Sequence, residues 1–169
     1  MNKCLLAALI VSLAVGTSFA GIVDISGRAG VFTAPGASAS SAMYGLAANV
    51  RLTDNWSLRA SVDTTSYTVN NNSVTYVPVR LDVIYTQTVA FFFHPYAGVG
   101  ASYNTTTVTG SPSTTATGAQ AEAGITFNLG GFTAGVEYCY LVPDLSRTGS
   151  GASFYDAYMT GGFTQSFGF

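Results

Sequence analysis

The residue types that most often carry chemistry are rare in this chain. His94 is the only histidine, and histidine is the side chain whose ordinary ionisation suits general-base chemistry near neutral pH. It precedes Pro95 near the end of an expected strand, where a hydrogen bond to the backbone or to water is its more ordinary role. One histidine and one cysteine, Cys139, on separate strands do not make a zinc site, so we expect no metal and no cofactor.

Charged side chains form the larger polar set, and they recur at alternating positions. Asp24 and Arg28 share a parity along the chain, as do Arg59 and Asp63, and so do Arg80 and Asp82. Ten charged residues fall within the segments that alternate in hydrophobicity, always on the face opposite the apolar series: Asp24, Arg28, Arg51, Arg59, Asp63, Arg80, Asp82, Glu122, Glu137 and Asp156. The sequence predicts that these residues meet inside an enclosed lumen, where opposite charges can pair.

The elements that must position this network are β-strands. Apolar and polar residues alternate with a period of two, which is typical of strands that separate an apolar face from a polar one. The alternating segments span about 21–34, 44–52, 56–63, 76–85, 91–103, 119–129, 132–140 and 154 to the end of the chain. We therefore predict an all-β fold, an eight-stranded antiparallel up-and-down transmembrane β-barrel.

Composition favours a barrel in lipid over one in water. Charged residues make up 8% of the chain, against about 25% in ordinary soluble domains, and the expected outer face carries none. Aromatic residues gather at both ends of the strands, as in barrels anchored at two membrane interfaces. A soluble, lipocalin-like barrel is the competing fold, with its apolar face turned inward around a ligand. The absence of a basic patch argues against nucleic-acid binding.

Residues 1–20 are predicted to be a cleaved signal peptide. Lys3 supplies a positive start, and residues 5–15 form an apolar stretch too short for a spanning helix. Ser18 and Ala20 supply the small residues expected before a cleavage site at Gly21. Cys4 precedes the apolar stretch, so it does not mark a lipoprotein. The domain expected after export is residues 21–169, and its destination is the bacterial outer membrane of a Gram-negative cell.

The expected connections differ between the two ends of the barrel. Short turns are predicted at 53–55, 86–88 and 130–131, as on the periplasmic side of such barrels. The connections 35–41, 70–73, 105–118 and 143–153 are mostly longer and are expected to be extracellular. They contain few charges and few aromatic residues, so they name no particular partner at the cell surface.

Three stretches resemble the small outer-membrane β-barrel proteins of the OmpA-type superfamily. Residues 76–81, Tyr-Val-Pro-Val-Arg-Leu, resemble the fourth strand of that group, and the glycine-rich residues 95–103 resemble the fifth. Phe163, Phe167 and Phe169 share a face and are similar to the C-terminal signal that the barrel-assembly machinery reads. Gln165 departs from that signal, which favours a hydrophobic residue there. The resemblance implies outer-membrane lipid, lipopolysaccharide and the assembly machinery as partners.

Three functions fit such a barrel. The first, which we favour, is a non-enzymatic structural or cell-surface interaction role, with the lumen filled by the charged side chains. The second is a narrow, porin-like channel or carrier for small or apolar solutes. The third is a lipid A-modifying enzyme, which would need a serine and a histidine near the extracellular rim. His94 is expected at the opposite end, so the chain offers no base for that reaction.

Overall fold

The computed structural model describes residues 23–34, 39–69, 71–90, 92–129, 132–146 and 154–163. For residues 128, 129, 132, 133 and 154–163 it describes the backbone alone. The predicted signal peptide, residues 1–20, and two residues of the predicted assembly signal, Phe167 and Phe169, lie outside these ranges. Phe163 is the last residue of a strand and pairs with Phe132 in register.

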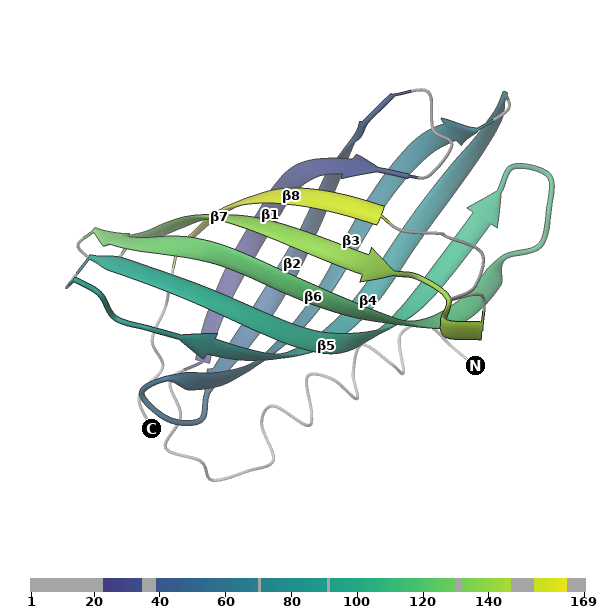
Figure 1. The fold of residues 1–169 in the computed structure, drawn as a ribbon. Helices are drawn as coiled ribbons and strands as arrows, with labels where there is room; N and C mark the ends of the chain where they lie inside the picture. Colours follow the sequence, from purple (N-terminus) through teal and green to yellow (C-terminus); the bar gives the residue numbers. More distant parts are fainter. Residues whose placement is uncertain are drawn as a thin grey trace.

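The described residues form strands that run up and down in chain order. They are β1 (Val23–Thr33), β2 (Ser41–Arg51), β3 (Trp56–Val69), β4 (Asn72–Thr86), β5 (Phe93–Val108), β6 (Thr114–Leu129), β7 (Phe132–Val142) and β8 (Phe154–Phe163). Each strand pairs antiparallel with the next, and β1 also pairs with β8, which closes the order into a barrel (Figure 1). The predicted all-β, antiparallel, up-and-down architecture is confirmed. No helix within these ranges is long and apolar enough to cross a membrane.

The barrel wall separates apolar from charged side chains because successive residues of a strand point to opposite faces. Leu46 and Val99 are about 60% exposed on the outer face (60% and 63%), with no charged neighbour in their strands on that face. Aromatic rings pack in pairs at the strand ends beside the short turns. Trp56 lies against Tyr85 at 5.0 Å and Phe93 against Phe127 at 5.5 Å between ring centroids. Tyr44, Tyr103, Tyr138 and Tyr140 are exposed toward the other end.

The connections at one end are tight. The β2–β3 turn is closed by the Leu52 amide, which donates to the Trp56 carbonyl oxygen at 2.8 Å. The Trp56 amide donates to Thr53 Oγ1 at 3.1 Å. The side-chain amide of Asn55 donates to the carbonyl oxygen of Thr86 at 2.9 Å, which ties this turn to the end of β4.

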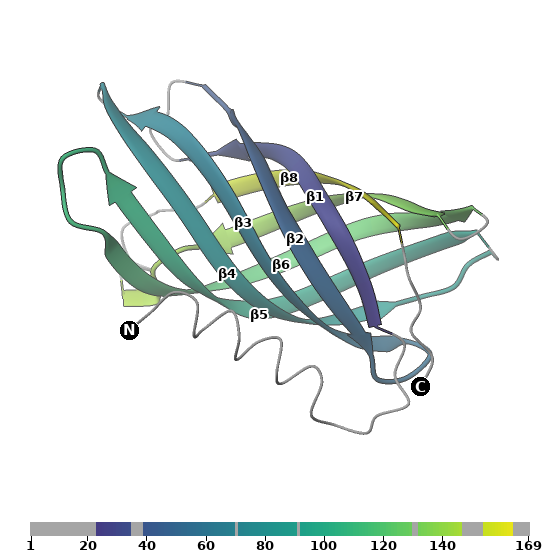
Figure 2. The same cartoon turned by 180° about the vertical axis from the view of Figure 1, so that it is seen from behind.

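At the other end, the strands of the hairpins are longer and their loops are shorter than predicted. Residues expected in the loops 70–73 and 105–118 belong mostly to strands, and only residues 70–71 and 109–113 connect them. Threonine-rich stretches alternate poorly in hydrophobicity, so their strand character was missed, although threonine favours strands. Asn71 (φ 63°) and Gly110 (φ 82°) adopt left-handed backbone conformations that tight hairpin turns require. Figure 2 shows these hairpins projecting beyond the rest of the wall.

The charged interior of the barrel

Among the described side chains, seven charged ones lie buried inside the barrel. They are Arg28, Arg59, Asp63, Arg80, Asp82, Glu122 and Glu137, each with at most 8% of its surface exposed, and they form what we call the interior charge cluster. Each of these side chains has the inward parity of its strand. Five strands contribute: β1, β3, β4, β6 and β7.

Glu137 on β7 is the most heavily bonded acid of the cluster. One carboxylate oxygen accepts from Arg28, and the other accepts from Arg59 Nη2 at 2.5 Å and from the Tyr96 hydroxyl at 2.6 Å. Arg59 also lies against the Tyr96 ring, with 5.6 Å between its Cζ and the ring centroid. Glu137 therefore joins β1, β3 and β5 through charge-assisted hydrogen bonds, which are stronger than neutral ones.

Asp63 on β3 forms a second centre. Its Oδ2 accepts from Arg80 Nη2 at 2.6 Å and lies 3.6 Å from Arg28 Nη1. Arg80 also donates through Nε to Ser61 Oγ at 3.2 Å and through Nη1 to Cys139 Sγ at 3.2 Å. The Arg80 guanidinium thus reaches from β4 to β3 on one side and to β7 across the barrel.

Asp82 and Glu122 are bonded more sparsely. Asp82, with 0% exposure, accepts one hydrogen bond, from Gln120 Nε2 at 2.5 Å on Oδ1, while its Oδ2 has no donor. Gln120 Nε2 also donates to the Ala101 carbonyl oxygen at 3.1 Å. Glu122 pairs with Arg59 through Oε1, and its Oε2 has no donor. Around Asp82 and Glu122 the cluster therefore has more hydrogen-bond acceptor oxygens than donors.

Glycines on β5 give these two acids their space. Gly100 pairs with Asp82 and Gln120 in register, and Gly98 pairs with Glu122. A Cβ at Gly100 would lie 2.3 Å from Asp82 Oδ1 and 2.2 Å from the Leu81 carbonyl oxygen. Because Gly98 and Gly100 have no side chains, side chains from β4 and β6 can extend over β5 and reach each other. We call these two residues the glycine floor.

Two predicted members of the network lie outside this cluster, and a third cannot be placed. Asp24 and Arg51 meet near the short turns, 3.9 Å apart, with 20% and 50% of their side chains exposed. They line a polar pocket of about 360 Å³ at the mouth of the barrel, which reaches inward to Arg59 and Tyr96. Asp156 pairs in register with Phe32 and Cys139, and its side chain lies outside the described atoms.

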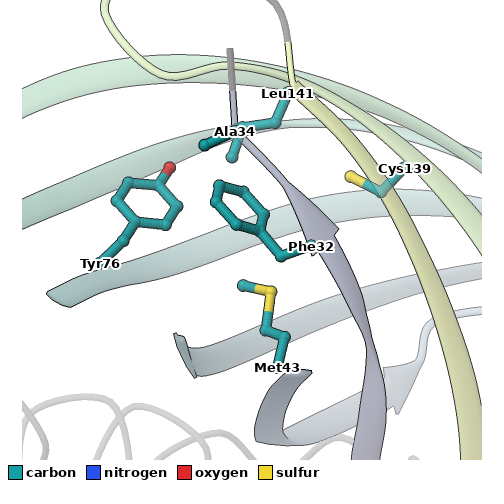
Figure 3. Packing of buried hydrophobic residues seen from close by; sticks show 6 residues of the cluster. All are labelled: Phe32, Ala34, Met43, Tyr76, Cys139 and Leu141. Carbon is teal, nitrogen blue, oxygen red and sulfur yellow. The ribbon is translucent and has the colours of Figure 1, made fainter. Parts of the chain in front are cut away.

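The interior also contains an apolar cluster that the sequence analysis missed. Figure 3 shows its six buried members: Phe32, Ala34, Met43, Tyr76, Cys139 and Leu141. Phe32 stacks on Tyr76 at 5.3 Å between ring centroids and packs against Tyr67 at 5.4 Å. These residues lie toward the long hairpins. Their signal was available, because Phe32, Met43 and Leu141 share the inward parity of the charged residues in their strands.

His94 has no catalytic surroundings in the described part of the chain. Its Nδ1 lies 3.3 Å from Thr88 Oγ1 near the short turns, at the end where the sequence placed it. The described residues contain no group of three or more histidine, cysteine or acidic side chains arranged to hold a metal ion.

Solved structures with the same fold are outer-membrane β-barrels. The N-terminal β-barrel domain of OprF from Pseudomonas aeruginosa superposes with a TM-score of 0.61 and 19% identity, covering 86% of this chain and 99% of that one. Neisserial surface protein A gives 0.60 and 18%, with coverage of 88% and 98%. Ail, the attachment invasion locus protein of Yersinia pestis, gives 0.56 and 15%, with coverage of 85% and 96%.

The fold of the chain is thus that of the small outer-membrane barrels, consistent with the OmpA-type resemblance. The outer membrane enzyme PagL shares it as well, with a TM-score of 0.51 and 14% identity over 81% of this chain and 97% of that one. The fold therefore does not by itself decide between an enzyme and a non-enzyme. No protein-family model matches the chain, and no curated protein matches it in sequence.

Proposed function

We propose that residues 21–169 form an eight-stranded transmembrane barrel of the bacterial outer membrane, with a non-enzymatic structural or cell-surface role. The observation that carries this proposal is the sidedness of the wall. The large residues that face outward midway along the strands, such as Leu46 and Val99, are apolar, while the charged residues of the interior charge cluster are buried. In water that arrangement would expose a wide apolar surface, whereas in lipid the same surface is satisfied.

The occupied interior supports a structural role over a conducting one. The interior charge cluster fills the middle of the barrel, and the apolar cluster around Phe32 and Tyr76 fills it toward the long hairpins. An eight-stranded barrel is about wide enough for side chains to fill. The narrow channel remains the second candidate, because the polar pocket beside Asp24 and Arg51 opens part of the way from the short-turn end.

Electrophoresis of the purified protein in detergent, with and without boiling, tests the barrel. A closed transmembrane barrel resists unfolding by the detergent at low temperature, so we expect the unboiled protein to migrate differently from the boiled one. Identical migration, or recovery of the exported protein in the soluble periplasmic fraction, would contradict a membrane barrel.

Planar-bilayer recording separates the structural role from the channel. A filled lumen predicts no stable conductance steps at neutral pH, and discrete steps would favour the channel. The enzyme alternative has its own measurement, the mass of lipid A from cells that produce the protein. We expect that mass to be unchanged because, among the described residues, the His94 ring has a hydrogen bond with Thr88 and none with a serine or a carboxylate.

Orientation and partners belong to the same proposal. We expect export by the signal peptide in residues 1–20 and insertion by the barrel-assembly machinery, which reads the terminal Phe163, Phe167 and Phe169. The tight turns then face the periplasm and the long hairpins face the cell surface, in contact with lipopolysaccharide. Deleting Phe169 should lower the amount of folded barrel in the outer membrane, as measured by the unboiled fraction in electrophoresis.

A further inference from the structure

The interior charge cluster contains one more acid than base. Three guanidinium groups, those of Arg28, Arg59 and Arg80, face four carboxyl groups. No lysine follows residue 3, and Arg51 lies half-exposed beside Asp24 near the short turns. The remaining arginine, Arg147, lies outside the described residues. An uncompensated charge in a buried site costs several kcal/mol, so proteins neutralise such a group or bind a counter-charge.

Contacts within the cluster identify the surplus acid. Glu137 pairs with two arginines, Asp63 with two and Glu122 with one. Asp82 has no arginine within 4.0 Å in the described structure, although it is wholly buried. Its one hydrogen bond comes from the neutral amide of Gln120.

The oxygens near Asp82 lack donors. Asp82 Oδ2, Gln120 Oε1 and Glu122 Oε2 are all buried without a hydrogen-bond partner. These side chains come from β4 and β6, on either side of the glycine floor of Gly98 and Gly100. A neutral carboxyl group has one O–H donor, which an ionised one lacks, so a proton supplies both the missing charge and a missing donor.

We infer that Asp82 carries a proton in the folded barrel at neutral pH, because it is the one acid among the described side chains of the cluster that has no arginine beside it. Two like carboxylates in one dry site do not both remain ionised, and the one without an arginine is the one that keeps the proton. Among the described residues, the buried titratable and charged groups that share the interior with Asp82 are Arg59 and Asp63 on β3, Arg80 on β4, Tyr96 on β5, Glu122 on β6, Glu137 and Cys139 on β7, and Arg28 on β1. Asp156 on β8 pairs in register with Cys139, and its side chain lies outside the described atoms.

The inference rests on the closed, dry interior of the proposed function, and it adds a protonation state to that interior. Infrared spectroscopy of the folded protein in detergent at neutral pH detects a protonated carboxyl group directly, through its C=O stretch. We expect this band in the wild type, its loss in Asp82→Asn and its persistence in Glu122→Gln. Electrophoresis of unboiled samples confirms that each protein is folded.

Stability supplies the second measurement. Asp82→Asn replaces a neutral acid by a neutral amide of the same shape, so the thermal unfolding temperature should stay within experimental error or rise. Glu137→Gln removes a charge that two arginines share and should lower that temperature. A wild type without the band already excludes a protonated Asp82, even where a variant fails to fold.

Several results would overturn the inference. They are a wild type without the band, a band that survives Asp82→Asn or disappears in Glu122→Gln, and an Asp82→Asn barrel as unstable as Glu137→Gln. A wild type whose stability requires sodium or potassium in place of choline would assign the missing charge to a bound cation. None of these outcomes bears on conductance, so failure here is distinguishable from failure of the proposed function.

Discussion

Arg80 and Asp63 meet inside the barrel with 2.6 Å between Nη2 and Oδ2, both side chains fully buried. They lie on β4 and β3, and the same Asp63 oxygen is 3.6 Å from Arg28 on β1. A contact that joins side chains from three strands in one buried site favours one set of neighbouring strands and one register. It also makes each partner costly to remove singly, because the other buried charge would lose its shortest ion pair.

Arg80→Ala should therefore destabilise the barrel by about 3–5 kcal/mol, the range found when one partner of a buried ion pair is removed. Unfolding by urea in detergent or lipid measures the change. Arg51→Ala is the matched control, since the exposed Arg51–Asp24 contact at 3.9 Å should contribute at most about 1 kcal/mol. Equal effects of the two substitutions would contradict an energetic role for the interior charge cluster.

The glycine floor under Asp82 gives a graded prediction. Gly100→Ala places a Cβ 2.2 Å from the Leu81 carbonyl oxygen, so backbone must move, at a cost of about 1–3 kcal/mol for overpacking. In Gly98→Ala the Cβ first meets Glu122 Oε1 at 2.8 Å, and the flexible end of that side chain can shift. Urea unfolding should rank Gly100→Ala as the less stable variant, and the reverse order would count against this packing.

The outer wall can be tested at Val99, which is 63% exposed midway along β5. Val99→Arg should cost about 2–4 kcal/mol if this face meets the bilayer core, the range for arginine at the midplane. Val99→Thr keeps the side-chain shape and should cost less. Thr107→Arg, on the same strand near the long hairpins, should be nearly neutral. A water-facing wall would tolerate Val99→Arg as well as Thr107→Arg.

Orientation can be measured by labelling single cysteines with a membrane-impermeant maleimide. Ser111→Cys in the β5–β6 connection should react in intact cells, whereas Asp54→Cys in the β2–β3 turn should react only after the outer membrane is opened. The wild type is the control, because Cys139 is wholly buried and should stay unlabelled. Labelling of Asp54→Cys alone in intact cells would invert the proposed orientation.

The period-two pattern predicted most of the strands, because apolar and polar residues alternate along a strand that has one apolar and one polar face. The parity of Arg28, Arg59 and Arg80 placed all three inside, where the structure has them buried. Which acid each arginine would bind did not follow, because strand register and diagonal contacts such as Arg80–Asp63 are not encoded in parity. The threonine-rich ends of β5 and β6 were taken for a loop because both of their faces are polar.

The apolar residues inside the barrel illustrate the other limit. Phe32, Met43 and Leu141 stand at inward positions whose other residues are mostly polar or small. A face assigned from the majority of its residues therefore does not predict that these three are inside. Only the closed barrel brings these three residues from β1, β2 and β7 together with Tyr76 from β4. Proximity across a closed sheet depends on strand tilt and stagger, which no single strand reveals.

The stacking of Phe32 on Tyr76 has a consequence for the permeability of the cell envelope. In the membrane barrel that we propose, the apolar cluster around Phe32 and Tyr76 would block hydrated solutes, so we expect high levels of this protein to leave the permeability barrier intact. Bacteria producing it at high level should retain their tolerance of small toxic compounds such as antibiotics. Phe32→Ala, which removes the largest part of this Phe32 contact, should lower that tolerance.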